Sequence, residues 1–176
     1  MTKKLSRPEL LARLRGIKLL SLDVDGVLTD GGLYYAEDGR QLRKFNVKDG
    51  MGMKLAMSVG VEVAIISAGD APCILKRGKD LGIRNVHIGA EDKLAKLKEI
   101  CAELGIALAH AAHMGDDLND IPALEAVGCA LTVADAVEAV KNLADFVTEK
   151  GGGGGAVREI CDLLAEAKTS PSVRQD

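Results

Sequence analysis

The stretch LLSLDVDGVLTDGG, residues 19–32, decides how this sequence is read. An apolar run that ends at Leu22 is followed by two acidic residues, Asp23 and Asp25, with one residue between them. In an extended chain alternate side chains point the same way, so we expect both carboxylates on one side and Val24 in the core. Gly26 then allows the backbone to turn. Two like charges this close disfavour each other's ionisation, and a bound cation would resolve that conflict.

Further apolar runs along the chain have the length and composition of buried strands. Segments with helical periodicity, such as 94–104 and 157–164, lie between most of them. This alternation predicts an α/β, Rossmann-like fold, with an open parallel sheet and helices on both of its faces. The predicted strands cover residues 17–22, 61–66, 85–88, 110–114, 129–132 and 145–147.

The segment after Asp25 departs from this alternation. Turn signals GG and DG separate the alternating stretches LYYA and QLRKF, which predicts a β-hairpin flap at about residues 31–45 and no separate cap domain. The tip is expected near residues 37–40. Because an isolated hairpin is weak in water, we expect the flap to cover a site or to pack on another subunit. An ordinary exposed hairpin is the alternative.

Length and composition limit the class of protein. The chain has 176 residues and a net charge of −3, which allows one sizeable core and argues against general binding of nucleic acid. The sequence has no apolar run as long as a membrane span and no apolar segment typical of a signal peptide. Its four cysteines form no CxxC pair, which predicts free thiols in a reducing cytoplasm. We expect a single domain over residues 1–168 and a frayed tail over residues 169–176.

Polar residues follow three of the predicted strands, at the edge of the sheet where ligands bind. Besides DVDG, the run IISAG places Ser67 before backbone N–H groups that are expected to open a helix and to suit an anion. MGDDLND supplies Asp116, Asp117 and Asp120. Lys93 is expected in the first turn of a helix, where the helix dipole disfavours a cation. A phosphate or a buried carboxylate partner would explain it.

Each of these features alone is more often a turn, a helix cap or a solvated surface residue. Their joint occurrence at strand ends predicts one site with carboxylates, a hydroxyl, backbone donors and an ammonium group. Oxygen ligands with open positions suit Mg²⁺, which shares its coordination with phosphate. The three histidines have no metal-binding spacing, so we expect His87, His110 and His113 to take no part in metal binding.

The order of these motifs resembles that of the haloacid dehalogenase superfamily of phosphatases. The stretches DVDGVLTDG, FNVKDGMG, MGDDLND and GGGGGAVREICDLL resemble its capless 3-deoxy-D-manno-octulosonate 8-phosphate phosphatase group, over about residues 17–165. The resemblance implies a Mg²⁺-dependent hydrolase of a sugar (ulosonic acid) phosphate, first of all 3-deoxy-D-manno-octulosonate 8-phosphate, that works through an aspartyl phosphate. It also implies a cytoplasmic homotetramer that serves lipopolysaccharide biosynthesis.

The resemblance assigns a role to each acidic residue that contacts the metal. Asp23 is implied to be the nucleophile that takes the phosphoryl group. Asp25 is implied to be the general acid for the leaving oxygen and then the base for water. The metal ligands implied by the resemblance are Asp23, Asp116 and the backbone carbonyl of Asp25.

The phosphate-binding residues also follow from the resemblance. Ser67 and the N–H of Ala68 would hold phosphate oxygens, and Lys93 would balance the charge on phosphate and nucleophile. Asp117 and Asp120 would orient Lys93 or the waters on the metal.

Two positions depart from the pattern of the group. Gly69 and Gly154 stand where the group typically has arginines that lie at or near the anionic substrate. The particular sugar acid therefore stays open, and a related nonulosonate phosphate or another small sugar phosphate is the alternative. Substrate-binding candidates on or beside the flap are Arg40, Arg43, Lys44, Lys48 and Asp49.

Two interpretations from other classes compete with a phosphatase. A receiver domain that accepts a phosphoryl group for signalling also uses acidic residues, Ser/Thr, Lys and Mg²⁺ on an open α/β sheet. Receivers carry the acceptor mid-chain and have no flap, which argues against this class. An inactive homologue kept as a structural partner is the other alternative, and the complete acidic set argues against it.

Overall fold

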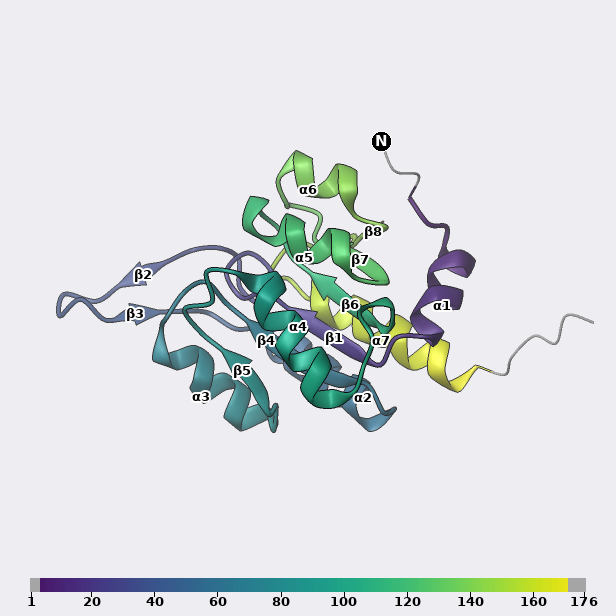
Figure 1. Cartoon of the computed structure of the whole chain (residues 1–176). Coiled ribbons are helices and arrows are strands. Elements are labelled where there is room, and N and C mark those ends of the chain that lie inside the picture. The colour runs from purple at the N-terminus through teal and green to yellow at the C-terminus, as the bar shows by residue number, and fades with distance from the viewer. Residues whose placement is uncertain (1–3, 171–176) are drawn as a thin grey trace, which may run out of the picture.

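The computed structural model describes residues 4–170, and its centre is a six-stranded sheet (Figure 1). All neighbouring strands are parallel, in the order β5-β4-β1-β6-β7-β8. Each predicted strand is present and begins or ends within two residues of the expected position. The strands of this sheet are β1 (Leu19–Leu22), β4 (Glu62–Ile66), β5 (Asn85–His87), β6 (Ala111–Met114), β7 (Cys129–Thr132) and β8 (Phe146–Val147).

Helices cover both faces of the sheet. Alternate residues of β1 enter different apolar clusters, because successive strand side chains point to opposite faces. Leu20 and Leu22 pack with α1, α2 and α7, whereas Leu19 packs with α4 and α5. The α/β fold class is therefore confirmed. The helices are α1 (Arg7–Arg15), α2 (Val47–Ser58), α3 (Pro72–Leu81), α4 (Lys93–Leu104), α5 (Ile121–Ala126), α6 (Glu138–Leu143) and α7 (Ala156–Thr169), with short 3₁₀ turns η1 (Leu108–His110) and η2 (Leu118–Asp120).

The loop after β1 is held against the glycine run that precedes α7. Gly26 has a φ of 96°, and this left-handed conformation turns the chain away from the sheet. A Cβ at Gly152 would lie 1.9 Å from the carbonyl oxygen of Gly26, so a side chain there would push the two loops apart. The N–H of Gly153 donates to the carbonyl of Val27 at 3.0 Å. The glycine run thus fixes the backbone that carries the two acidic residues.

The predicted hairpin is present and projects away from the sheet (Figure 1). Strands β2 (Tyr34–Tyr35) and β3 (Gln41–Leu42) pair antiparallel, and the turn between them is closed by the N–H of Ala36 bonded to the carbonyl of Arg40. The side chains of Tyr34, Tyr35 and Leu42 are exposed. In the single chain the hairpin therefore leaves an uncovered apolar surface.

The ends of the chain and the cysteines complete the comparison with the sequence. Helix α7 continues to Thr169, one residue into the predicted tail, and residues 171–176 lie outside the described part of the chain. The single domain over residues 1–168 stays a prediction. All four cysteines are free, as expected. Among residues 4–170, no helix is both long and apolar enough to cross a membrane.

Candidate active site

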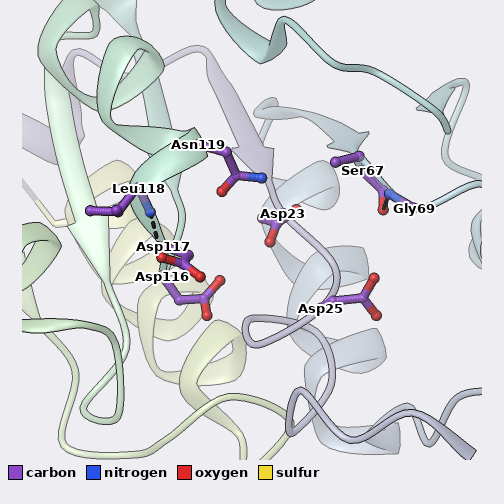
Figure 2. Close-up of a pocket in the computed structure, with 9 residues that line it drawn as sticks. Asp23, Asp25, Ser67, Gly69, Asp116, Asp117, Leu118 and Asn119 are labelled. Atoms are coloured by element: carbon purple, nitrogen blue, oxygen red, sulfur yellow. Dashed lines mark hydrogen bonds between the residues drawn. The ribbon is translucent and has the colours of Figure 1, made fainter.

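A pocket of about 470 Å³ opens at the carboxyl ends of β1, β4 and β6. Figure 2 shows Asp23 between the acidic loop that follows β6 and the loop that follows β4. The three strand-end motifs singled out in the sequence therefore meet, because the carboxyl ends of parallel strands share one edge of the sheet. The lining residues are Asp23, Asp25, Ser67, Ala68, Gly69, Asp116, Asp117, Leu118 and Asn119.

Lys93 is buried beside the pocket residue Asp23 and joins two carboxylates. It is the first residue of α4 and is 2% exposed. Its Nζ lies 2.7 Å from Oδ1 of Asp23 and 2.6 Å from Oδ1 of Asp120. Burial opposes the charge on Lys93, but the two carboxylates outweigh burial and raise its pKa. Of the two explanations that the sequence left open, a phosphate or a buried carboxylate partner, the structure shows two buried carboxylate partners.

The acidic residues form a cluster with room for a cation. Single carboxylate oxygens of Asp23, Asp116 and Asp120 lie within 4.8 Å of one another. Oδ1 of Asp116 is buried and has no hydrogen-bond partner among the described residues. A Cβ at Gly26 would lie 2.1 Å from Oδ2 of Asp116, so glycine is needed for this approach. An unpartnered buried oxygen inside an oxygen-only cluster fits a hard divalent ion such as Mg²⁺.

Burial makes the charged forms of two of these carboxyl groups costly in the metal-free protein. Burial and the charge of Asp120 raise the pKa of Asp23 to about 7, against the opposing effect of Lys93. Burial and Asp120 likewise raise the pKa of Asp116 to about 6. A divalent cation would favour the ionised forms of both groups. Metal binding should therefore leave the carboxyl groups of both Asp23 and Asp116 ionised.

The pKa of Asp120 is instead lowered, because hydrogen-bond donors surround its carboxylate. Its burial disfavours the charge, but hydrogen bonds from His113 and the charge of Lys93 hold its pKa at about 2. Oδ2 of Asp120 accepts from the backbone N–H of Asp116 at 3.1 Å and from that of Asp117 at 3.4 Å. Asp120 therefore links Lys93 to the loop that carries Asp116.

His113 supports this network and was not expected to belong to it. Its Nε2 lies 3.0 Å from Oδ1 of Asp120, and its Nδ1 lies 3.1 Å from Oγ of Ser21. Because a carboxylate accepts only, the Nε2–H donates to Asp120. Ser21 and His113 are register partners in β1 and β6. The sequence does show a polar residue inside each of these two buried strands, which could have indicated a buried hydrogen bond. Their pairing, however, depends on a strand register that the sequence alone does not reveal.

We expect His113→Phe to reduce turnover about tenfold and to destabilise the protein by roughly 1–3 kcal/mol. The change removes a donor from buried Asp120 and leaves the hydroxyl of Ser21 unpaired. Turnover, thermal melting and the pH profile would be measured together. His110 is exposed, so His110→Phe is the matched control. Equal behaviour of the two variants would contradict a supporting role for His113.

The loop after β4 differs from the expectation in one respect. Ser67 is fully buried, and its Oγ accepts from the N–H of Gly69 at 3.1 Å. Helix α3 begins at Pro72, so the expectation that a helix opens directly after Ser67 is wrong. The backbone donors at this edge of the pocket come from a loop, where Ala68 and Gly69 line the opening. Pro72, the first residue of α3, has no backbone N–H and so cannot donate a hydrogen bond to an anion.

Asp25 faces the pocket and is held from the hairpin. Arg43 donates to its carboxylate through Nε at 2.6 Å to Oδ1 and through Nη2 at 3.0 Å to Oδ2. The hydrogen bonds to Asp25 raise the pKa of Arg43, so its guanidinium stays charged. Asp117, by contrast, is exposed and caps η2 by accepting from the N–H of Leu118.

The remaining substrate-binding candidates do not line the pocket. Arg40 and Lys44 are exposed and pair with Asp38 and Asp30. Lys48 is exposed at the start of α2. Asp49 is 1% exposed, and its Oδ1 accepts from the N–H of Arg158 at 2.8 Å, which caps α7 from a neighbouring helix. Within one chain, Arg43 is the candidate of this group that reaches the pocket region.

Comparisons with known proteins agree with this geometry. The family model of haloacid dehalogenase-like hydrolases matches residues 82–160. The 3-deoxy-D-manno-octulosonate 8-phosphate phosphatase of Escherichia coli (strain K12) is 43% identical over 160 residues, which cover 91% of this chain and 85% of that protein. This chain belongs to the haloacid dehalogenase-like hydrolases. Within them it belongs to the family of that phosphatase.

Solved structures of this phosphatase family have the same fold. The enzyme of Moraxella catarrhalis, in complex with a magnesium ion, a phosphate ion and a 3-deoxy-D-manno-octulosonate (KDO) molecule, is 38% identical, with a TM-score of 0.88 over 90% of this chain and 91% of that one. The cobalt-bound enzyme of Haemophilus influenzae is 38% identical, with a TM-score of 0.87 over 93% of this chain and 96% of that one. The family identifies the chain as a phosphatase, and therefore as an enzyme and not a receiver domain.

Proposed function

We propose that this phosphatase hydrolyses 3-deoxy-D-manno-octulosonate 8-phosphate, with Mg²⁺, in the cytoplasm during lipopolysaccharide biosynthesis. The observation that carries the proposal is the acidic cluster of Asp23, Asp116 and Asp120, in which buried Lys93 pairs with Asp23 and Asp120, beside the pocket. Relatives with 38% to 43% identity over most of the chain bear the name of this activity. The solved relative with magnesium, phosphate and KDO supports both the metal and the sugar acid.

The residues of the pocket have complementary tasks in such a hydrolysis. An oxygen of Asp23 attacks phosphorus, and the bond between phosphorus and the leaving sugar oxygen breaks while Asp25 gives that oxygen a proton. A water molecule then attacks phosphorus, Asp25 takes its proton, and the bond from phosphorus to Asp23 breaks. Inorganic phosphate leaves, and both carboxyl groups return to their first state.

Charge neutralisation makes the first attack feasible, because carboxylate and phosphate repel each other. Lys93 supplies one positive charge beside Asp23. A bound Mg²⁺, held by Asp23, Asp116 and the backbone carbonyl of Asp25, would supply the rest and polarise the phosphoryl group. Ser67 lies opposite the acidic loop (Figure 2). It would hold phosphate oxygens together with the backbone of Ala68, which also lines the pocket.

A substrate comparison tests the proposal. Phosphate release would be measured with Mg²⁺ on 3-deoxy-D-manno-octulosonate 8-phosphate, a nine-carbon ulosonate phosphate, a pentose 5-phosphate and 4-nitrophenyl phosphate. We expect kcat/KM to be highest for the eight-carbon acid and at least about tenfold higher than for the pentose 5-phosphate, which lacks a carboxylate, since a hydrogen bond to a charged group contributes on the order of 1.5–3 kcal/mol. A preference for another sugar phosphate would reassign the substrate. No release from any ester would support the inactive homologue.

We also propose that the chain forms a homotetramer through the hairpin. Exposed apolar side chains gather on the hairpin and the start of α2, namely Leu33, Tyr34, Tyr35, Leu42, Val47 and Met51. Such a cluster on a projecting two-stranded hairpin favours burial against another subunit. The family resemblance supports the same arrangement. A neighbouring hairpin would then help to close each pocket.

Light scattering on the purified protein tests the assembly. We expect a mass of about 74 kDa, four times the 18.5 kDa of one chain. Replacing Tyr34 and Tyr35 together by serine should lower the mass to that of smaller species, because it removes apolar area from the interface. Val137→Ser, at an exposed apolar residue outside the hairpin, should leave the mass unchanged. A wild-type monomer at micromolar concentration with full activity would contradict the tetramer.

A further inference from the structure

Arg43 behaves unlike the rest of the hairpin. The side chains of its neighbours are open to solvent, with Leu42 at 54% and Tyr35 at 65% exposure, whereas the side chain of Arg43 is 3% exposed. It leaves the hairpin and reaches Asp25 with two hydrogen bonds, of 2.6 Å and 3.0 Å. A planar guanidinium that binds both oxygens of a carboxylate fixes the rotation of that carboxylate as well as its position.

Gly69 provides the space that this pairing needs. A Cβ at residue 69 would lie 2.9 Å from Nη2 of Arg43 and 3.0 Å from Oδ2 of Asp25. The backbone of Gly69 is not in the left-handed region, so its conformation alone does not require glycine. The requirement is spatial. A side chain at this position would occupy the contact between guanidinium and carboxylate.

The remaining contacts of the hairpin show how much depends on Arg43. Its Nη1 donates to Oε1 of Gln41 at 3.2 Å, which holds the guanidinium in line with the strand. The other ion pair that ties the hairpin to the loop after β1 joins Lys44 to Asp30, and the Lys44 side chain is 63% exposed. Exposed pairs of this kind contribute little. Arg43 is therefore the buried polar link between the hairpin and the pocket.

We propose that Arg43 is the positioning residue of Asp25, and that Gly69 stays small so that the guanidinium can hold this carboxylate toward the leaving group. The inference rests on the proposed function, in which Asp25 gives a proton to the leaving oxygen. Arg43 contacts Asp25 but neither phosphorus nor the leaving oxygen in that scheme. Because a guanidinium favours the ionised carboxylate, it keeps one oxygen of Asp25 while the other carries the proton. In the first step its contribution is orientation of the acid, so it should matter there only where the leaving oxygen needs a proton.

The identity of the leaving group separates orientation of the acid from a general structural role. A sugar phosphate expels an alkoxide, which needs a proton in the transition state, whereas 4-nitrophenyl phosphate expels a stable phenolate, which does not. General acid catalysis contributes about 10²- to 10⁴-fold. Loss of orientation should therefore slow the first step strongly with the sugar phosphate and weakly with the aryl phosphate, whereas the second step, in which Asp25 acts as base, is common to both.

The test compares Arg43→Ala, Arg43→Lys and Gly69→Ala with Arg7→Ala, using the Mg²⁺-loaded enzyme. Arg7 lies on α1, outside the hairpin and the pocket, and pairs with Glu166, so it is the control. We expect Arg43→Ala to lower kcat/KM, which reports the steps up to loss of the leaving group, about 100-fold for the sugar phosphate and less than about fivefold for 4-nitrophenyl phosphate. Arg43→Lys keeps the charge without the fork and Gly69→Ala crowds it, so both should show a smaller loss with the same selectivity. Arg7→Ala should match the wild type on both esters.

Each other outcome overturns the inference. Equal losses on the two esters would show that Arg43 acts on folding or on phosphate binding, and thermal melting of Arg43→Lys would confirm whether the fold persists. Wild-type rates in Arg43→Ala would show that Asp25 needs no such support. Failure of the wild type on both esters would instead refute the proposed function, and the inference with it.

Discussion

Asp23→Asn is expected to lower turnover by about 10⁴-fold or more, because it removes the nucleophile on which both steps depend. The side chain keeps its shape, so the fold should persist. Phosphate release from the sugar phosphate with Mg²⁺ is the measurement, after mass spectrometry has excluded deamidation back to Asp. Asp30→Asn is the control, since Asp30 lies in the same loop but outside the pocket and pairs with exposed Lys44. Near wild-type turnover in Asp23→Asn would remove Asp23 from the mechanism.

The same variant should be more stable than the wild type in metal-free buffer at high pH. The pKa of Asp23 is raised in the folded protein to about 7 from an ordinary 3.8, so between these values the folded state binds more protons than the unfolded state. The stability that this proton provides is present at low pH and is lost as the pH rises toward 7. Asn does not titrate and avoids the loss. Melting curves at pH 5 and pH 8 should show a difference that grows with pH, on the order of a few kcal/mol.

Removal of Mg²⁺ is expected to abolish turnover, and its return to restore turnover. The carboxylate cluster and the phosphate all carry negative charge, and Lys93 alone cannot neutralise them. Binding should also raise the melting temperature. A metal present at 100 times its dissociation constant adds roughly 2.7 kcal/mol to the free energy of unfolding, which corresponds to about 5–10 °C for a chain of this size.

The pH dependence of metal binding gives this prediction a second readout. The metal must displace protons from Asp23 and Asp116, whose pKa values are raised to about 7 and about 6. The apparent affinity for Mg²⁺ should therefore be weaker at pH 5.5 than at pH 8. Asp116→Asn should lose most of the melting shift, whereas Asp117→Asn, at an exposed residue, should retain it. An unchanged melting temperature at millimolar Mg²⁺ in the wild type would contradict the site.

The positions of the site residues could be predicted because parallel strands share one carboxyl edge. Asp23, Ser67 and Asp116 each follow an apolar run, and topology alone brings such positions together. The unusual place of Lys93, a cation at a helix start, indicated an anionic partner, either a phosphate or a buried carboxylate, for an equally local reason. The hairpin followed from turn signals and alternation. These features depend on neighbours in sequence or on the fold class.

The contacts that could not be predicted depend on distances between separate segments. His113 reaches Asp120 because β6 and β1 pair in one particular register. Asp49 was expected near the substrate, but α2 packs on α7 and turns it inward as a cap. Gly69 departs from the family pattern. The consequence of this departure depends on the guanidinium of Arg43, which the fold brings beside Gly69.

Direct detection of the phosphorylated residue tests the central claim. Enzyme turning over the sugar phosphate with Mg²⁺ would be quenched in acid and treated with borohydride, which reduces an aspartyl phosphate to homoserine and leaves free carboxylates unchanged. Tandem mass spectrometry of the peptide that spans residues 19–40 distinguishes Asp23 from Asp25. The account predicts homoserine at residue 23 alone, dependent on substrate and Mg²⁺. Reduction at another carboxylate, or none while phosphate is released, would contradict it.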